Sequence, residues 1–411
     1  MISIKYNKSM TKSNTDKQKI QDLLERGVEN IYPNKGFLEK ELKSGKKLSL
    51  YLGVDPTGST LHLGHAIVLA KLKQFQDLGH KVILLIGDFT ATIGDPTDKK
   101  STRQPLNRKQ VLQNAKNYKK QAQVFLKFTG NNKAEIKYNS KWLDKMNFVD
   151  VLELSAKFTV GQLLERDMFQ ERIKSGKPIG MHEFMYPILQ AYDSVAMDVD
   201  GELGGNDQTF NMLAGRTLMK SIKNKEKFVL TMKLLTDTSG TKMGKSEGNM
   251  LALTDTPDEM LGKVMSWTDE MILNGFELCT RVKMSEINKI AKELKAGSNP
   301  RDAKLRLAKE IVTLYYNTNE ANKAEANFIK IFSKKGTPDD MPEINISKNK
   351  VSPIDLLSEL KFVSSKGEAR RLIDGGGMKI NNEKITSWKD DVSIKSGDII
   401  QAGKRKFAKI K

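Results

Sequence analysis

Residues 48–65, LSLYLGVDPTGSTLHLGH, decide the fold. The first seven of them are mostly apolar, which predicts a buried strand, and the turn-forming residues DPTGST follow directly. A helix is then predicted over about 61–78, and Gly79 ends it. A buried strand that passes through a tight turn into a helix is the usual beginning of a parallel α/β sheet.

The same alternation continues on both sides of this stretch. A charged helix is predicted near 16–27 and a Lys/Gln-rich helix over about 107–128, while 140–197 is mainly helical and a further helix starts near Asp207. Continuous apolar strands predict a Rossmann-like parallel sheet with both faces covered by helices. The further strands are predicted at 81–87, 134–139, about 195–203 and 227–235.

A chain of 411 residues is too long for one ordinary domain. Residues 333–350 are rich in Pro, Lys, Asp and Asn, which indicates a linker, and 256–332 has a helical pattern without a strand. We therefore predict five segments. They are an N-terminal extension and helix (1–30), a Rossmann-type catalytic domain (31–250, with a helical segment at about 140–195), an all-α domain (251–332), the linker (333–350) and a small α+β domain (351–411).

The charge balance indicates a polyanionic partner. The formal net charge is +19, which favours nucleic acid, although a basic surface can also serve solubility alone. The single cysteine, Cys279, excludes an intramolecular disulfide and fits a reducing compartment, so we expect a cytoplasmic protein. With four histidines and a lone cysteine, no structural zinc site is expected. No apolar run reaches the ~18 residues of a membrane span. The first 16 residues lack the apolar core of a secretory signal, which leaves a frayed start or an organellar targeting peptide.

The helix start at His62-Leu63-Gly64-His65 is a candidate phosphate site. Free N–H groups and a partial positive charge at a helix N-terminus suit a phosphate, and two imidazoles three residues apart can both donate to it. Gly64 would let a flat ring approach the backbone. A bare HxxH is more often a surface pair, but here it follows a strand and a DPTG turn.

A second candidate phosphate site is Lys242-Met243-Gly244-Lys245-Ser246, which follows the last predicted strand in a glycine-rich segment. Two ammonium groups on a mobile loop can neutralise a departing pyrophosphate. As an isolated string, such a segment is usually a solvated loop.

A polar stripe marks the helix that contains EFMYPILQAYD. Tyr186, Gln190 and Asp193 are spaced i, i+4 and i+7 and share one face. An amphipathic helix would expose such a stripe to water. Because the neighbouring residues are apolar almost all round, we expect this stripe to line a cavity instead.

Taken together, HLGH and KMGKS resemble the two signatures of class I aminoacyl-tRNA synthetases. The stretches LYLGVDPT, EFMYPILQAYD and LGGNDQ resemble tyrosyl-tRNA synthetases of the bacterial type, and the resemblance runs over roughly 30–411. Gly244 departs from the commoner Ser at that position, which bears on loop mobility more than on chemistry. The resemblance implies a tyrosine–tRNA ligase that forms tyrosyl-adenylate from ATP, releases pyrophosphate, and loads tyrosine onto tRNA(Tyr).

The resemblance also implies roles for individual residues. Asp193 and Tyr51 would hold the phenol hydroxyl of tyrosine, and Tyr186, Gln190 and Asp95 would bind its α-ammonium. Two phenol partners would also reject phenylalanine, which lacks the hydroxyl, and enzymes of this type are a known case of such discrimination without editing. The rest of the tyrosine pocket would be Gly53, Asp55 and Gln208.

ATP would be bound at the other end of the site, with Mg²⁺ held mainly by phosphate and water and without a metal site of the protein itself. By resemblance, Asp207 would bind the ribose, and Gly64 and Gly205 would let the adenosine approach. The phosphates would be contacted by Thr57, His62, His65, Lys242, Lys245 and Ser246, with Lys99 and Arg103 adding to pyrophosphate binding.

Residues 351–411 carry 13 Lys plus Arg and 8 Asp plus Glu, a net of 13 − 8 = +5. Ser352-Pro353 predicts a helix start, a second helix begins near Ser365, and strands are expected near 399–401 and 406–410. The unit resembles an α-L RNA-binding domain, with the basic pair Arg370-Arg371 on its second helix. An inert basic tail is the alternative.

Three other functions fit parts of the sequence. A tRNA synthetase for tryptophan would have the same fold. A catalytically silent RNA-binding protein on the same scaffold would have the same basic charge, and a nucleotidyltransferase that does not use tRNA would have the same phosphate motifs. The Tyr51/Asp193 pair, the two intact signatures and the basic C-terminal unit argue against them in turn. By the same resemblance, we expect a homodimer joined through 140–195 and an anticodon-side role for 251–332.

Overall fold

The computed structural model describes residues 13–97, 106–236, 250–333, 341–346, 350–403 and 406–411. The chain divides into two compact units, one formed by 1–255 with 267–303 and the other by 256–266 with 304–411. None of the helices in the described part of the chain combines the length and apolar character that a membrane crossing needs.

The first unit is built on a sheet of six strands within the described residues, in the order β1-β6-β5-β2-β3-β4. The pairs β2–β3, β2–β5, β3–β4 and β5–β6 are parallel, as the apolar runs predict. Only the edge pair β1–β6 is antiparallel. The strands are β1 Val28–Tyr32, β2 Ser49–Val54, β3 Lys81–Ile86, β4 Glu135–Tyr138, β5 Gly201–Gly205 and β6 Phe228–Met232.

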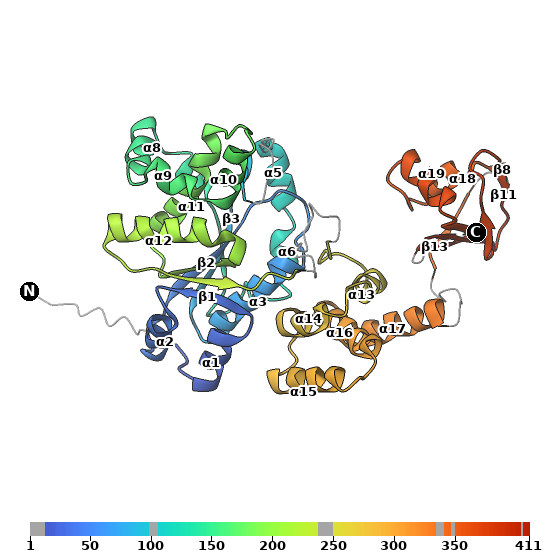
Figure 1. Cartoon of the computed structure of the whole chain (residues 1–411), viewed down its shortest axis with the longest axis horizontal. Helices are drawn as coiled ribbons and strands as arrows, with labels where there is room; N and C mark the ends of the chain where they lie inside the picture. The colour runs from blue at the N-terminus through green and yellow to red at the C-terminus, as the bar shows by residue number, and fades with distance from the viewer. Residues whose placement is uncertain (1–12, 98–105, 237–249, 334–340, 347–349, 404–405) are drawn as a thin grey trace, which may run out of the picture. The chain divides into compact units, whose positions relative to one another are not determined.

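Helices cover both faces of this sheet. Figure 1 shows α11 and α12 on one side of the strands and α3 on the other. The helices of the unit are α1 Lys17–Glu25, α2 Lys35–Lys43, α3 Leu63–Asp77, α4 Thr90–Ile93, α5 Arg108–Ala115, α6 Tyr118–Ala122, α7 Ser140–Leu143, α8 Phe148–Ser155, α9 Val160–Leu164, α10 Asp167–Lys174, α11 Met181–Met197, α12 Thr209–Lys223, α14 Met271–Cys279 and α15 Met284–Lys295.

Most predicted elements are confirmed within a few residues, and three predictions need correction. The single helix expected over 107–128 is two helices, α5 and α6, because Tyr118 and Gln121 turn inward and bind the chain around Gly58. The strand expected from about 195 begins only at 201, since α11 continues to Met197 and ends at Asp198 in the left-handed conformation. The sheet is not wholly parallel, because β1 joins its edge in the opposite direction.

The sheet order places a crevice at one edge of the sheet. The chain passes from β2 to β3 on one side, and β5 lies on the other side of β2. The carboxyl ends of β2 and β5 therefore flank a topological switch point, where ligands bind in open α/β sheets.

The second unit contains α13 Pro257–Met265, which packs against α17 Thr318–Ser333, and most of α16 Pro300–Tyr315. Its C-terminal part has a sheet in the order β10-β9-β12-β13-β7 and a pair β11–β8. The elements are β7 Glu343–Ile344, β8 Lys350–Val351, α18 Pro353–Glu359, α19 Lys366–Asp374, β9 Met378–Ile380, β10 Glu383–Ile385, β11 Val392–Ser393, β12 Ile399–Ala402 and β13 Lys406–Ile410.

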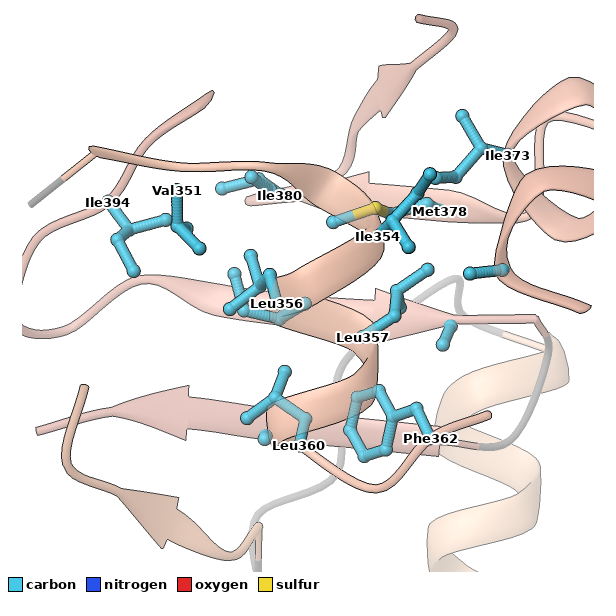
Figure 2. Packing of buried hydrophobic residues seen from close by; sticks show 14 of the residues in the cluster. Val351, Ile354, Leu356, Leu357, Leu360, Phe362, Ile373, Met378, Ile380 and Ile394 are labelled. Atoms are coloured by element: carbon cyan, nitrogen blue, oxygen red, sulfur yellow. The ribbon is translucent and has the colours of Figure 1, made fainter. Parts of the chain in front are cut away.

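An apolar core holds this C-terminal part together. Figure 2 shows Leu356 and Leu357 of α18 in one cluster with Met378 of β9, and all three are buried, as is Leu360 directly after the helix. The predicted helix start is confirmed, with Ser352 as N-cap and Pro353 in the first turn of α18. Strand β7 lies inside the segment expected to be a linker and pairs with β13 in parallel.

Candidate active site

A cavity of about 630 Å³ opens at the carboxyl ends of β2 and β5. It gathers all of the predicted site residues of the catalytic unit that the structure describes. These are Tyr51, Gly53, Asp55, Thr57, His62, Gly64, His65, Asp95, Tyr186, Gln190, Asp193, Gly205, Asp207 and Gln208. Lys99, Arg103, Lys242, Lys245 and Ser246 lie outside the described residues.

Asp193 is a buried carboxylate on the cavity-facing side of α11. Trp142 donates to its Oδ1 at 2.8 Å through the indole N–H, and Asn139 donates to Oδ2 at 3.3 Å. Burial raises the pKa of Asp193 well above its ordinary value, and these two hydrogen bonds oppose the shift. Asp193 therefore lies in a dry environment, where neutral donors bind both of its oxygens.

Tyr51, at the centre of β2, is fully buried. Its hydroxyl lies 3.1 Å from Oγ of Ser194. Burial raises the pKa of Tyr51 well above that of an ordinary tyrosine, and the nearby carboxylates Glu202 and Asp193 add to this. The phenol therefore remains protonated and can donate a hydrogen bond.

Asp55 connects three elements beside the cavity. Tyr186 donates to its Oδ2 at 2.9 Å, and Thr90 donates to its Oδ1 at 2.7 Å. Gly87 leaves the space for this arrangement, because a Cβ at that position would collide with Asp55 Oδ1 and Thr90 Oγ1. The end of β2, the start of α4 and the middle of α11 are therefore held in one geometry.

Asp95 is held by donors from several directions. Gln208 donates to its Oδ2 at 2.9 Å, while the backbone N–H and hydroxyl of Thr97 donate to Oδ1 at 3.0 and 2.7 Å. Arg166 lies 3.7 Å from Oδ1 and donates to Thr97 Oγ1 at 2.7 Å. Asp95 thus presents an oriented carboxylate to the cavity.

The histidine pair caps the N-terminus of α3. Gly64 N–H donates to His62 Nδ1 at 3.2 Å, and His62 N–H donates to His65 Nδ1 at 3.2 Å. Each Nδ1 is therefore an acceptor, which leaves each Nε2 as the hydrogen-bond donor of its ring. Burial lowers the pKa of His65 well below its ordinary value, and His62 adds to this, so His65 is neutral.

Backbone pairing joins this helix start to the chain that follows residues 237–249. His62 and Ala252 form an antiparallel bridge, with Leu63 N–H donating to Leu251 at 3.0 Å and Leu253 N–H donating to Leu61 at 2.9 Å.

Gly205 is the last residue of β5, and Asp207 follows two residues later. Asp207 belongs to a short 3-10 helix, Asn206–Gln208. A Cβ at Gly205 would lie 2.6 Å from Asp207 Oδ1, so glycine lets the carboxylate fold back over the strand end. Both residues line the same cavity as Gly64.

Several residues that contact the site were not predicted from the sequence. Asn139 and Trp142 follow β4, and the end of a parallel strand was a usable signal for the first of them. Glu202 also lines the cavity, and a charged residue inside the buried strand GELGG was the signal for it. Thr90, Ser194 and Lys227 gave no such signal.

In the C-terminal part, Arg370 and Arg371 lie exposed on α19. The guanidinium of Arg370 stacks 4.7 Å over the ring of Trp388. Among the described residues, no group of three or more His, Cys, Asp or Glu side chains is arranged to hold a metal ion.

Comparisons with known proteins agree with this geometry. Residues 43–333 match the model of class I tRNA synthetases for tryptophan and tyrosine, and residues 333–410 match the C-terminal domain of tyrosine–tRNA ligases. A tyrosine–tRNA ligase of Moorella thermoacetica is 44% identical over 94% of both chains. One from Carboxydothermus hydrogenoformans is 46% identical over 95% of this chain and 97% of its own.

Solved structures share the fold at lower identity. A truncated mitochondrial tyrosyl-tRNA synthetase of Aspergillus nidulans has a TM-score of 0.64 at 23% identity and covers 76% of this chain and 94% of its own. The tyrosine complex from Archaeoglobus fulgidus has a TM-score of 0.59 at 21% identity and covers 75% of this chain and 99% of its own.

The fold and the matched family model define a class I tRNA synthetase. Within that class, the chain belongs to the tyrosine–tRNA ligase family. It charges tRNA with tyrosine, using ATP as a substrate.

Proposed function

We propose that tyrosine is activated in the cavity between β2 and β5, with its ring directed towards Tyr51 and Asp193. The observation that carries this assignment is the buried carboxylate of Asp193 beside the buried phenol of Tyr51. One supplies an acceptor and the other a donor, which is what a phenol hydroxyl needs in a dry pocket. Phenylalanine would leave both groups unpaired.

The α-ammonium of tyrosine binds among Tyr186, Gln190 and Asp95, and Gly53, Asp55 and Gln208 complete this side of the pocket. Asp95 is supported here by Gln208, Thr97 and Arg166. The substrate carboxylate then points towards the start of α3, where the phosphates of ATP bind.

The carboxylate of tyrosine attacks the α-phosphorus of ATP, and the bond to the bridging oxygen breaks as pyrophosphate leaves. A carboxylate is already a nucleophile, so positioning and charge neutralisation supply the catalysis. Thr57, His62 and His65 contact the phosphates, and Lys242, Lys245, Ser246, Lys99 and Arg103 neutralise the pyrophosphate. Asp207 binds the ribose, and Gly64 and Gly205 let the adenosine approach. A terminal ribose hydroxyl of tRNA(Tyr) then attacks the activated carbonyl and releases AMP.

Mg²⁺ enters with ATP. Its ligands are mainly phosphate oxygens and water, which is the usual way in which Mg²⁺ accompanies a nucleotide.

A homodimer forms through the helical segment at about 140–195. Its support is a group of exposed apolar side chains on α8 to α11. Phe148 is 75% exposed, Val160 69% and Met181 76%, and the group also includes Val149, Leu152 and Ile173. Such a concentration of exposed apolar residues is typical of a surface that another chain covers.

Binding of tRNA uses two further parts of the chain. Residues 351–411 carry the RNA-binding surface with Arg370 and Arg371, and 251–332 faces the anticodon side. The protein acts in the cytoplasm, where its one cysteine, buried at position 279, stays reduced.

The test is amino-acid-dependent exchange of pyrophosphate into ATP without tRNA, with tyrosine, phenylalanine and tryptophan offered in parallel. Exchange with tyrosine alone supports the pocket assignment, and its loss in Lys245→Ala supports the role of the second motif. Exchange with tryptophan would reject the specificity. No exchange from a folded protein that still binds tRNA would favour the silent scaffold.

A further inference from the structure

Glu202 and Lys227 form an ion pair in the interior, beside the proposed tyrosine pocket. The two side chains are 2% and 0% exposed and come from strand β5 and from the residue just before the neighbouring strand β6. Glu202 lines the cavity, whereas Lys227 lies just behind it. A buried ion pair is costly to desolvate and adds little net stability, so its presence beside a site calls for another explanation.

Lys227 is connected to the phenol of Tyr51 by hydrogen bonds through Ser194. Its ammonium donates to Ser194 Oγ at 2.7 Å, and Ser194 Oγ lies 3.1 Å from the hydroxyl of Tyr51. An ammonium has only donors, so the oxygen of Ser194 accepts from Lys227. The hydroxyl hydrogen of Ser194 can then be donated to Tyr51. The hydrogen of Tyr51 is in that arrangement left for an acceptor other than Ser194, either the carboxylate of Glu202 or a ligand in the cavity.

Glu202 accepts a hydrogen bond directly from Gln190. One carboxylate oxygen of Glu202 accepts from Lys227, and the other accepts from the amide NH₂ of Gln190 at 3.1 Å. A carboxylate has no donor, so it fixes which end of the amide is the nitrogen. The amide oxygen of Gln190 is buried and has no partner among the described residues, which leaves it as an acceptor for a bound ammonium.

Helix α12 leaves room for the ion pair and Ser194 at Gly215, which has no side chain. A Cβ at Gly215 of α12 would lie 2.6 Å from the ammonium of Lys227, 3.0 Å from Ser194 Oγ and 3.4 Å from a carboxylate oxygen of Glu202. The ammonium also lies 5.8 Å from the centre of the Tyr51 ring. The pair therefore occupies a shaped space between two strands and two helices.

We propose that Lys227 and Glu202 are positioning residues that set tyrosine specificity from behind the pocket. Through Ser194, Lys227 directs the hydrogen of Tyr51 at the phenol oxygen of the substrate, which in turn donates to Asp193. Glu202 turns the amide oxygen of Gln190 towards the substrate α-ammonium. This inference rests on the proposed binding of tyrosine between Tyr51 and Asp193.

Ser194→Ala is the first test, because it breaks the connection to Tyr51 and leaves the ion pair intact. We expect the KM for tyrosine in pyrophosphate exchange to rise about tenfold, while the KM for ATP and the weak exchange with phenylalanine stay unchanged. The preference for tyrosine over phenylalanine therefore falls about tenfold. A merely structural role of Ser194 would change both amino acids alike.

The second test is the double variant Lys227→Met with Glu202→Gln, which removes both charges of the ion pair and so leaves no unpaired charge in the interior. We expect the same loss of preference, together with a further rise in the KM for both amino acids, because the amide of Gln190 is no longer oriented. Lys71→Met is the matched control. Lys71 is also a buried lysine, but it donates to the carbonyl of Leu23 outside the cavity, so its loss should leave the preference unchanged.

A wild-type preference in Ser194→Ala would overturn the proposal, and so would equal changes for tyrosine and phenylalanine. Should the double variant fail to fold, Ser194→Ala decides alone. An unchanged tyrosine KM in Asp193→Asn would instead reject the tyrosine site itself, so the two failures are distinguishable.

Discussion

The indole N–H of Trp142 donates a 2.8 Å hydrogen bond to Oδ1 of Asp193. It joins α7, which follows β4, to the C-terminal half of α11, and Asp193 lines the cavity. The contact holds the carboxylate in one orientation without neutralising it. A carboxyl group that is oriented by a neutral donor remains available to a ligand.

Asp193→Asn should lower kcat/KM for tyrosine in pyrophosphate exchange by roughly 10- to 100-fold, because a charged acceptor becomes a weaker neutral one. The same change should stabilise the fold. Since burial raises the folded pKa of Asp193, the folded state binds the proton more tightly than the unfolded state. Stability is therefore lost as pH rises through that raised pKa, and the ionised group costs stability at neutral pH. Thermal unfolding at pH 7 measures the difference in stability between the variant and the wild type. A variant that is less stable than the wild type would contradict this prediction.

The activity of His65 should not follow the titration of an ordinary imidazole. Its pKa is lowered well below the usual value by burial and by His62, so the ring stays neutral across the neutral range. We expect the pH profile of kcat for exchange to have the same shape near pH 6.5 in the wild type and in His65→Asn, because His65 does not titrate there. A pH profile with saturating tyrosine and ATP measures this. An inflection that the variant abolishes would mean that His65 acts as a cation.

Gly87→Ala should reduce exchange about 100-fold, because a new Cβ would displace Asp55 and Thr90 from each other and shift the proposed tyrosine site. Gly36→Ala in α2 is the matched control, since a Cβ there lies at an ordinary 3.4 Å from Asn34 Oδ1. The kinetics of both variants should be compared after their folding is checked by circular dichroism. Equal activity of the two variants would exclude a role for the Asp55–Thr90 contact.

Phe148→Glu combined with Leu152→Glu should convert a dimer into monomers, because two charges would enter an apolar contact. Sedimentation velocity at micromolar concentration measures the change. Leu112→Glu on α5 is the control, as Leu112 is also apolar and 46% exposed but lies outside the α8–α11 group. A wild-type protein that sediments as a monomer would refute the dimer itself.

Arg370→Glu combined with Arg371→Glu should raise the KM for tRNA in aminoacylation and leave pyrophosphate exchange unchanged, because α19 belongs to the C-terminal part. The slope of log Kd for tRNA against log salt should also fall by about 1 for each lost phosphate contact. Lys17→Glu with Lys19→Glu, an exposed pair on α1, is the charge-matched control. A comparable tRNA defect in that control would indicate an effect of net charge alone.

The central sheet and the candidate phosphate-binding end of the site were predictable because their sequence signals are local. The apolar run of β2, the DPTG turn and the histidines follow one another within 18 residues, so one stretch specifies strand, turn and helix start. The polar stripe of α11 was also predictable, since its neighbours are apolar on nearly every side. Each of these features depends on residues close together in the chain.

The remaining features depend on contacts between distant residues. Strand β1 has a mixed sequence, VENIY, with a half-exposed burial pattern, and it becomes a strand only by pairing with β6 almost 200 residues later. Asn139 and Trp142 reach Asp193 only because β4 and α11 are brought together by the sheet. Lys227 resembles an ordinary charged residue before a strand, and only the fold buries it against Glu202.

The antiparallel bridge between His62 and Ala252 attaches the chain that follows the second motif to the start of α3. Lys245 is six residues from Leu251, whose carbonyl is bonded to the start of α3. Six residues of chain span at most about 22 Å, so the Cα atom of Lys245 is tethered within about that distance of Leu251. In the proposed mechanism, its ammonium therefore meets a triphosphate bound at the histidines at an effective concentration of about millimolar, which is set by covalent attachment and independent of the amount of protein.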